Sequence, residues 1–204
     1  HTVQAPALLI APMACKTVDA LDRPLLLIDL EPGHPHYRHF QALAAPGVQA
    51  LHGTPLAALQ ALGRAFAAGR LQGQAVDAQV REAVAAVAHH LPQPKPLDPR
   101  VRKLMCLLDE DPGAELERLA PLLGLSAHHA SRLFHQGLGL PLRRYALSIK
   151  IRAAASFMGS GLALTQIAQA AGFVDSAHFA KVWAQNYGAA PPRFFATASP
   201  HIDQ

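Results

Sequence analysis

The stretch IAQAAGFVDSAHFAKVWAQNYGAAPPRFF, residues 167–195, decides the fold of the C-terminal half of the chain. Gly172 divides its first part into two helical segments, because glycine readily takes the positive φ that a tight turn needs. In the second segment Phe179, Val182 and Trp183 recur at helical spacing, which indicates a face turned toward a core. The stretch therefore predicts two helices joined by a tight turn.

An earlier part of the chain repeats this pattern. Residues 119–125 match residues 167–173 at an offset of 48, and after a one-residue insertion residues 131–134 match residues 180–183 at an offset of 49. Self-similarity of this kind indicates a repeated structural unit. Each copy is predicted to be a helix-turn-helix unit, with Gly124 at the turn of the first copy.

Prolines and glycines divide the rest of this half into further helices. A Pro-rich segment, PQPKPLDP at residues 92–99, cannot propagate a helix and is predicted to be a linker. After the linker the sequence predicts seven helices joined by short loops, which together make an all-α unit of about 100 residues. They are expected from Pro99 to the Pro112-Gly113 break, over 114–123, from a Ser126 cap to about 137, over 142–158, 164–171 and 176–187, and in a last turn after Pro192.

These residues resemble the AraC family of bacterial transcription regulators. The resemblance runs from about residue 98 to 197 and rests on ELERLAPLLGLS, SRLFHQGLGLPLRRY, the connecting helix SIKIRAAASFM and the run GF-x(5)-F-x(3)-W-x(4)-G-x(2)-P, which is the most diagnostic part. In that family the domain binds double-stranded DNA as two helix-turn-helix units, each with its second helix in one of two successive major grooves. The resemblance implies the same partner and arrangement here.

The second helix of each unit supplies the candidate base-contacting residues. Arg132 is the strongest of them, since a guanidinium can bridge guanine O6 and N7, and Lys181 occupies the equivalent place. Ala177 offers only an apolar contact, for instance to a thymine methyl. The full set is His128, His129, Ser131, Arg132 and Gln136 (or His135 in its place) in the first helix, and Ser176, Ala177, His178 and Lys181 in the second.

Basic residues just after each unit are candidates for contacts with DNA phosphates, namely Arg143, Arg144 and Arg193. Residues 115–197 carry 8 Lys+Arg against 3 Asp+Glu, a net charge of +5, whereas residues 1–97 carry 7 against 6. This excess is compatible with a polyanionic partner. For each of these histidines and arginines the alternative interpretation is an ordinary solvated helix face.

Composition excludes several classes of protein. The chain has 204 residues, is 50% hydrophobic and carries a net charge of +4, which excludes intrinsic disorder. Its sequence holds no apolar run of the ~18 residues that a membrane span needs, so no membrane partner is expected. Cys15 and Cys106 are too few for a disulfide framework or a four-thiolate zinc site, so a cytoplasmic location is expected.

The N-terminal half is predicted to be a small α+β domain, so that the whole chain is mainly α. Aliphatic runs predict strands over Ala5–Ile10, Pro24–Leu30 and Val48–Leu51, followed by two helices over 55–68 and 75–91. The apolar stripes of these helices fit either core packing or a homodimer interface. The predicted domains are 1–91, the linker 92–97, the DNA-binding domain 98–197 and a tail, 198–204.

AraC-type regulators usually carry an N-terminal cupin-like sensor followed by two helices that can dimerise. The strands and helices of residues 5–91 are similar to the back part of that arrangement. Because the strands are too few for a barrel and the chain begins at His1 rather than Met, the sensor is expected to be reduced or truncated at its start. The resemblance implies a sensor that can bind a small-molecule effector; the sequence leaves open whether one exists, and whether the regulator activates or represses.

A catalytic function is not predicted, and neither is a cofactor. The alternative is a metal-binding cupin enzyme with a helical appendage, built on His34, His36 and Glu31 in the loop EPGHPHYRHF. Pro35 lies inside the histidine pair, and a polar loop is the simpler interpretation. Two further alternatives are a DNA alkylation-repair protein, which would need a cysteine cluster, and an interaction module that no longer binds DNA.

Overall fold

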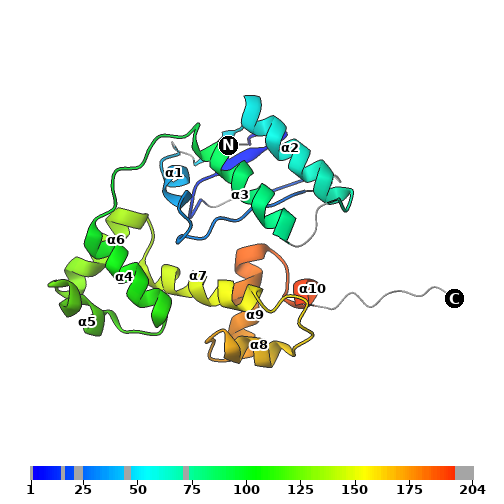
Figure 1. Cartoon of the computed structure of the whole chain (residues 1–204). Helices are drawn as coiled ribbons and strands as arrows, with labels where there is room; N and C mark the ends of the chain where they lie inside the picture. The colour runs from blue at the N-terminus through cyan, green and yellow to red at the C-terminus, as the bar shows by residue number, and fades with distance from the viewer. Residues whose placement is uncertain (1, 15–16, 21–24, 44–46, 71–73, 196–204) are drawn as a thin grey trace. The chain divides into compact units, whose positions relative to one another are not determined.

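The chain is described by a computed structural model, in which the placed residues are 2–14, 17–20, 25–43, 47–70 and 74–195 (Figure 1). The predictions that concern His1, Cys15, Pro24 and the tail 198–204 lie outside the described residues. Within the described ranges no helix combines the length and the apolar character needed to cross a membrane.

The structure is mainly helical, as predicted, with a small two-stranded sheet. It divides into two compact units: residues 1–98 with 133–140, and residues 99–132 with 141–204. Residues 92–98, which include the predicted linker 92–97, form neither helix nor strand. Their role as a boundary between independently folding domains stays a prediction.

In the first unit a two-stranded antiparallel sheet packs with helices. Strand β1 (Leu8–Ile10) pairs with β2 (Val48–Ala50), with Leu9 opposite Gln49. The helices are α1 (Tyr37–Gln41), α2 (Gly53–Ala67) and α3 (Gln74–Ala88). A buried core joins β1, α3 and the segments that follow β2 and α3; it consists of Leu9, Leu51, Val87 and Leu91, with Phe40, Leu56 and Leu59 partly buried against it.

Two predictions for this unit were wrong. Residues 25–30, predicted as a strand, run without a strand partner, and the side chains of Leu25 and Leu27 are 61% and 56% exposed. A strand needs a neighbour for its N–H and C=O groups, and in the described residues β1 and β2 pair with each other. The segment 31–40, interpreted as a loop, forms tight turns and then α1.

Most of the apolar stripe residues of the predicted 55–68 and 75–91 helices pack within the unit, but Phe66 is 51% exposed. Leu62, Val84 and Val87 are buried, and Leu59 is partly buried against the core. The core-packing interpretation therefore holds for these side chains. A dimer contact through α2 and α3 stays a prediction.

The helices after residue 98 follow the predicted order. The predicted 114–123 helix is a short α-helical turn followed by a 3₁₀ turn that contains Pro121, whose missing N–H removes one helical hydrogen bond. The connecting helix ends at Ala155, and turns follow it. The elements are α4 (Pro99–Glu110), α5 (Leu116–Leu119), η1 (Ala120–Leu123), α6 (Ala127–Leu138), α7 (Leu142–Ala155), α8 (Leu164–Ala170), α9 (Ser176–Tyr187) and α10 (Pro192–Phe195).

The two predicted helix-turn-helix units have the same backbone turn. Gly124 and Gly172 take φ of +67° and +77°, as the sequence predicts. The residue after each glycine donates its N–H to the carbonyl of the residue five positions earlier, at 3.1 and 2.9 Å. These acceptor residues, Ala120 and Ala168, are buried, so the helices of each unit can approach closely. The repeat in sequence is thus a repeat in structure.

An aromatic cluster around Trp183 forms the core of the second helix-turn-helix unit. The ring centroid of Trp183 lies 4.5 Å from that of Tyr187, 4.8 Å from that of Phe195 and 5.6 Å from that of Phe179. Such ring pairs add about 0.5–1.5 kcal/mol each beyond the burial of their area. Trp183 and Phe179 are fully buried.

The turn glycine of the second unit should be sensitive to substitution. A Cβ at Gly172 would meet the Lys150 side chain at 3.8 Å, an ordinary contact, so the cost of Gly172→Ala comes from its positive φ. We expect this change to lower the free energy of unfolding by about 1–2 kcal/mol, measured by urea denaturation with Trp183 fluorescence. Gly113→Ala is the matched control, since Gly113 lacks a positive φ. Equal effects of the two changes would contradict this assignment of the cost.

Candidate nucleic-acid interface

The first candidate recognition helix, α6, is oriented by its cap and its buried face. The Ser126 hydroxyl accepts a hydrogen bond from the His129 backbone N–H at 3.3 Å, as expected of an N-cap. Ala130, Phe134 and Leu138, spaced four residues apart, are buried on one side of the helix. The opposite side therefore faces solvent.

That outer side carries the residues predicted for the first base-reading set. His128, Arg132 and Gln136 follow one another at four-residue spacing along it, and all three are exposed. His129, Ser131 and His135 flank this row and are exposed as well. The helix thus presents a long polar face with one guanidinium near its middle.

The second candidate recognition helix, α9, is built in the same way. The Asp175 carboxylate accepts a hydrogen bond from the His178 backbone N–H at 2.6 Å and caps the helix. Phe179, Val182 and Trp183 are buried, as predicted. The outer side exposes the remaining predicted residues, Ala177, His178 and Lys181, while Ser176 is partly buried.

Lys181 and Arg132 occupy the same place in their units. Each lies six residues after its capping residue, Asp175 or Ser126, and each is exposed. The His178 ring also has a fixed neighbour, since it lies edge-on to the Phe173 ring with centroids 5.6 Å apart. The outer faces of α6 and α9 therefore carry a cation at equivalent positions, whereas their other exposed residues differ.

Ion pairing separates the cations of this part of the chain into two groups. Arg118 pairs with Asp111 at 2.5 Å, and Arg152 pairs with Asp109 at 3.3 Å. The second group is exposed and makes no ion pair or hydrogen bond with another described residue through its side chains. Its members are the predicted DNA contacts Arg132, Arg143, Arg144, Lys181 and Arg193.

A buried tyrosine, Tyr145, connects α7 to α4. Two of these cations, Arg143 and Arg144, lie in the first turn of α7. The Tyr145 hydroxyl donates to the Asp109 carboxylate, with both oxygens at 3.4 Å. Burial, and then the charge of Asp109, raises the pKa of Tyr145, so the hydroxyl keeps its proton as the donor. This contact fixes the start of α7, where Arg143 and Arg144 lie.

One exposed residue at this surface, Val174, was not singled out from the sequence. Leu125 and Phe173 match at an offset of 48, whereas the capping residues Ser126 and Asp175 match at 49. Val174 is therefore the residue inserted in the second unit. Its side chain is 87% exposed, more than any other large apolar side chain among the described residues. The break in the repeat offset is the signal that could have located it.

The family comparison agrees with this geometry. Residues 119–197 match the family model described as a helix-turn-helix domain. They form a helix-turn-helix domain of the AraC type. The domain covers both repeated units, from the end of α5 to the end of α10.

Curated relatives match about half of the chain. The HTH-type transcriptional regulator GbdR, from two strains of Pseudomonas aeruginosa, is 29% identical over 99 residues, which cover 47% of this chain and 26% of the regulator. This chain therefore spans about a quarter of the length of the curated relatives it matches.

Two solved structures are also similar. The C-terminal domain of AraT, a response regulator from Geobacillus stearothermophilus, is 23% identical with a TM-score of 0.46 over 54% of this chain and 96% of that one. The C-terminal domain of the two-component response regulator yesN from Fusobacterium nucleatum is 23% identical with a TM-score of 0.40, over 46% of this chain and 92% of that one.

The histidine-rich segment of residues 31–40, which runs into α1, does not favour the metal-binding cupin alternative. The described residues contain no group of three or more His, Cys, Asp or Glu side chains that could hold a metal ion. Nδ1 of His34 instead accepts a hydrogen bond from the His36 backbone N–H at 3.1 Å, within the turn that leads into α1. The rings of His34, His36 and His39 follow one another with centroids 5.6 and 5.4 Å apart.

The hydrogen bond that His34 Nδ1 accepts requires a neutral His34 ring. Burial, and then the neighbouring His36, lowers the pKa of His34 below its ordinary 6.5. Burial, and then His39 and His89, lowers the pKa of His36. A protonated Nδ1 on His34 could not accept the backbone bond. The unfolded chain therefore binds protons more tightly at these sites than the folded chain does.

Acidification should loosen α1. Because both pKa values are lower in the folded state, the stability they contribute is present above about pH 6.5 and is lost as the pH falls below it. We expect hydrogen–deuterium exchange over residues 33–43, corrected for intrinsic rates, to rise between pH 7.5 and 5.5. His34→Asn with His36→Asn, which keeps an acceptor without titration, should remove the rise. The exposed His52→Asn is the control, and a rise that survives the double change would contradict the assignment.

Proposed function

We propose that this chain is a transcription regulator that binds double-stranded DNA with α6 and α9 in two successive major grooves. The observation that carries the proposal is the repeated geometry of the two units. Both have a capping side chain, a glycine turn and an exposed cation six residues after the cap. A helix held by such a unit can enter the major groove with its outer face toward the bases.

In the first unit the proposed base contacts lie along the outer face of α6. Arg132, exposed and without a carboxylate partner among the described residues, has the donor fork that matches guanine O6 and N7. The remaining contacts are assigned to the side chains around it on the same exposed face: His128, His129, Ser131 and Gln136.

In the second unit the proposed contacts are fewer and less polar. Lys181 and His178 supply the hydrogen-bond donors, Ser176 lies at the first turn of α9, and Ala177 is limited to apolar contact. Arg143, Arg144 and Arg193 are proposed to hold phosphates, which sets the position of the protein on the duplex. This helix should therefore rely more on apolar contact and phosphate contacts than α6 does.

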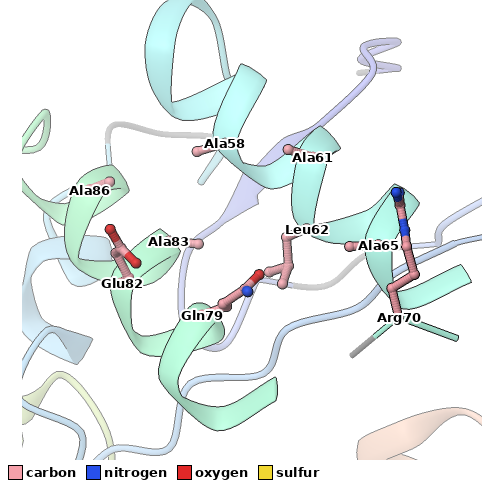
Figure 2. Close-up of a pocket in the computed structure, with 9 residues that line it drawn as sticks. All are labelled: Ala58, Ala61, Leu62, Ala65, Arg70, Gln79, Glu82, Ala83 and Ala86. Carbon is pink, nitrogen blue, oxygen red and sulfur yellow. The ribbon is translucent and has the colours of Figure 1, made fainter. Parts of the chain in front are cut away.

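A homodimer through α2 and α3 is part of the proposal. Between these helices lies a groove of about 650 Å³, with alanines on both walls (Figure 2). Small side chains allow the helix of a second copy to approach closely, and a dimer would present four recognition helices to a longer site. The walls consist of Ala58, Ala61, Leu62, Ala65 and Arg70 on one side, and Gln79, Glu82, Ala83 and Ala86 on the other.

In this proposal the protein has no catalytic role and acts in the cytoplasm, where the DNA of a bacterial cell lies. An effector that binds the N-terminal half is proposed from the resemblance to AraC-type regulators. The helix-turn-helix domain and the regulators it resembles support DNA binding over the cupin alternative.

Arg132→Ala should weaken binding to a specific site by about 1–3 kcal/mol and leave binding to random duplex nearly unchanged. The reason is that Arg132 contacts a base edge in the proposed complex rather than a phosphate. The measurement is fluorescence anisotropy with a duplex enriched from a random library and with a scrambled duplex. Arg64→Ala, an exposed arginine of α2, is the control.

Arg143→Ala should give a different result from Arg132→Ala. Loss of a phosphate contact should weaken binding to both duplexes alike and reduce the slope of log K against log salt by about 1. The base-reading role of Arg132 is wrong if its substitution behaves as Arg143→Ala does. Binding that does not respond to salt would reject DNA recognition altogether.

Ala61→Arg should dissociate the proposed dimer. Ala61 is exposed and lines the groove, so a long charged side chain there obstructs a partner helix without disturbing the core. The measurement is sedimentation equilibrium over a concentration series. Gln60→Arg, one position away and outside the groove, is the control. A monomeric unmodified chain, or equal masses for all three proteins, would contradict a dimer through this face.

A further inference from the structure

Val174 has no structural use that the described residues show. It directly precedes the Asp175 cap of α9, a position from which an apolar side chain often packs against the fourth residue of the helix. Here that residue is Phe179, which is fully buried. Its ring already contacts those of Phe173, Trp183 and Phe195, with centroids 5.2, 5.6 and 5.9 Å away. The packing position is filled, and Val174 is left 87% exposed.

The first unit has nothing equivalent. Val174 is the inserted residue between Phe173 and the Asp175 cap, whereas in the first unit Leu125 is followed directly by the Ser126 cap. The insertion therefore adds one exposed branched apolar side chain where α9 begins. The start of a recognition helix is the part that contacts base edges in helix-turn-helix complexes.

The neighbours of Val174 make this end of α9 apolar. The Asp175 carboxylate is bound to the His178 backbone N–H at 2.6 Å, so it is occupied by the cap. Ala177, in the first turn, is exposed and has only a methyl group to offer. Lys181, one turn further on, is the nearest cation on the same row.

Among the base-pair groups that line the major groove, the C5-methyl of thymine is the apolar one. We propose that Val174, together with Ala177, contacts the C5-methyl group of a thymine in the half-site bound by the second unit. This inference rests on the proposed DNA binding and adds to it a residue that determines specificity. The first unit then reads its half-site by hydrogen bonds, and the second reads a methyl group.

The test removes the methyl group from the DNA and the side chain from the protein separately. A duplex enriched by the purified full chain from a random library is resynthesised with deoxyuridine in place of one thymidine at a time, which deletes only the C5-methyl. At one thymine, or two adjacent ones, the dissociation constant should rise about four-fold, as expected for the loss of one buried methyl group. 5-Bromouracil, whose bromine fills the same space, should restore affinity there.

Val174→Ala identifies the residue responsible. At 87% exposure the change leaves the core untouched, and the variant should keep the circular dichroism and melting curve of the unmodified chain. It should bind the thymine duplex less tightly and lose most of the discrimination between thymine and uracil at that one position. The discrimination between thymine and uracil at other positions of the site should not change, because Val174 does not contact those positions in the proposed complex. Comparison of the two single changes with the combined change gives the coupling energy of the contact.

Met158→Ala is the control, an exposed apolar residue that follows α7. It should keep the full discrimination between thymine and uracil. The inference is overturned if no thymine shows the loss with uracil, or if Val174→Ala keeps the same discrimination as the unmodified chain. It is also overturned if the enriched half-site of the second unit has no thymine. Failure to enrich any sequence would instead overturn the proposed function itself, and this inference with it.

Discussion

The packing of Trp183 is the interaction on which the exposed outer face of α9, in the second helix-turn-helix unit, depends. Its fully buried side chain contacts four other aromatic rings, contributed by α9 itself and by α10. A helix held by so large a side chain cannot rotate about its axis without opening the core, since interiors are close-packed. The outward direction of Ala177 and Lys181 is therefore a consequence of the rings on the inner side: Phe179, Tyr187, Phe194 and Phe195.

The two repeated units share a backbone plan but differ in the chemistry of their outer faces. The first has a hydroxyl cap and exposed imidazoles on either side of Arg132 along the helix. The second has a carboxylate cap, and Val174 and Ala177 stand before Lys181. Hydrogen-bond donors discriminate strongly among bases, whereas a methyl contact discriminates less. In the proposed complex the duplicated scaffold would thus contact bases in two unlike ways.

Periodicity and turn residues predicted most of the helical half correctly, because α9 and its counterpart are stabilised by local signals. Gly124 and Gly172 mark the turns, and the four-residue spacing of buried side chains marks the faces. The N-terminal compact unit, residues 1–98 with 133–140, was predicted less well. Residues 25–30 read as a strand by composition, yet a strand also needs a partner, which no local pattern specifies. The helix α1 is only five residues long and carries too little periodicity to detect.

The sequence by itself determined the repeat, the turn glycines and the outer rows of α6 and α9, because these follow from the 3.6-residue period and from local backbone preference. Tertiary structure decided the properties that depend on distant neighbours. It bound Arg152 to Asp109 and left Arg132 without an ion-pair partner among the described residues. The rings of Phe173 and Phe195 also pack against Phe179, where the Val174 side chain could otherwise have packed, and Val174 is left exposed to solvent.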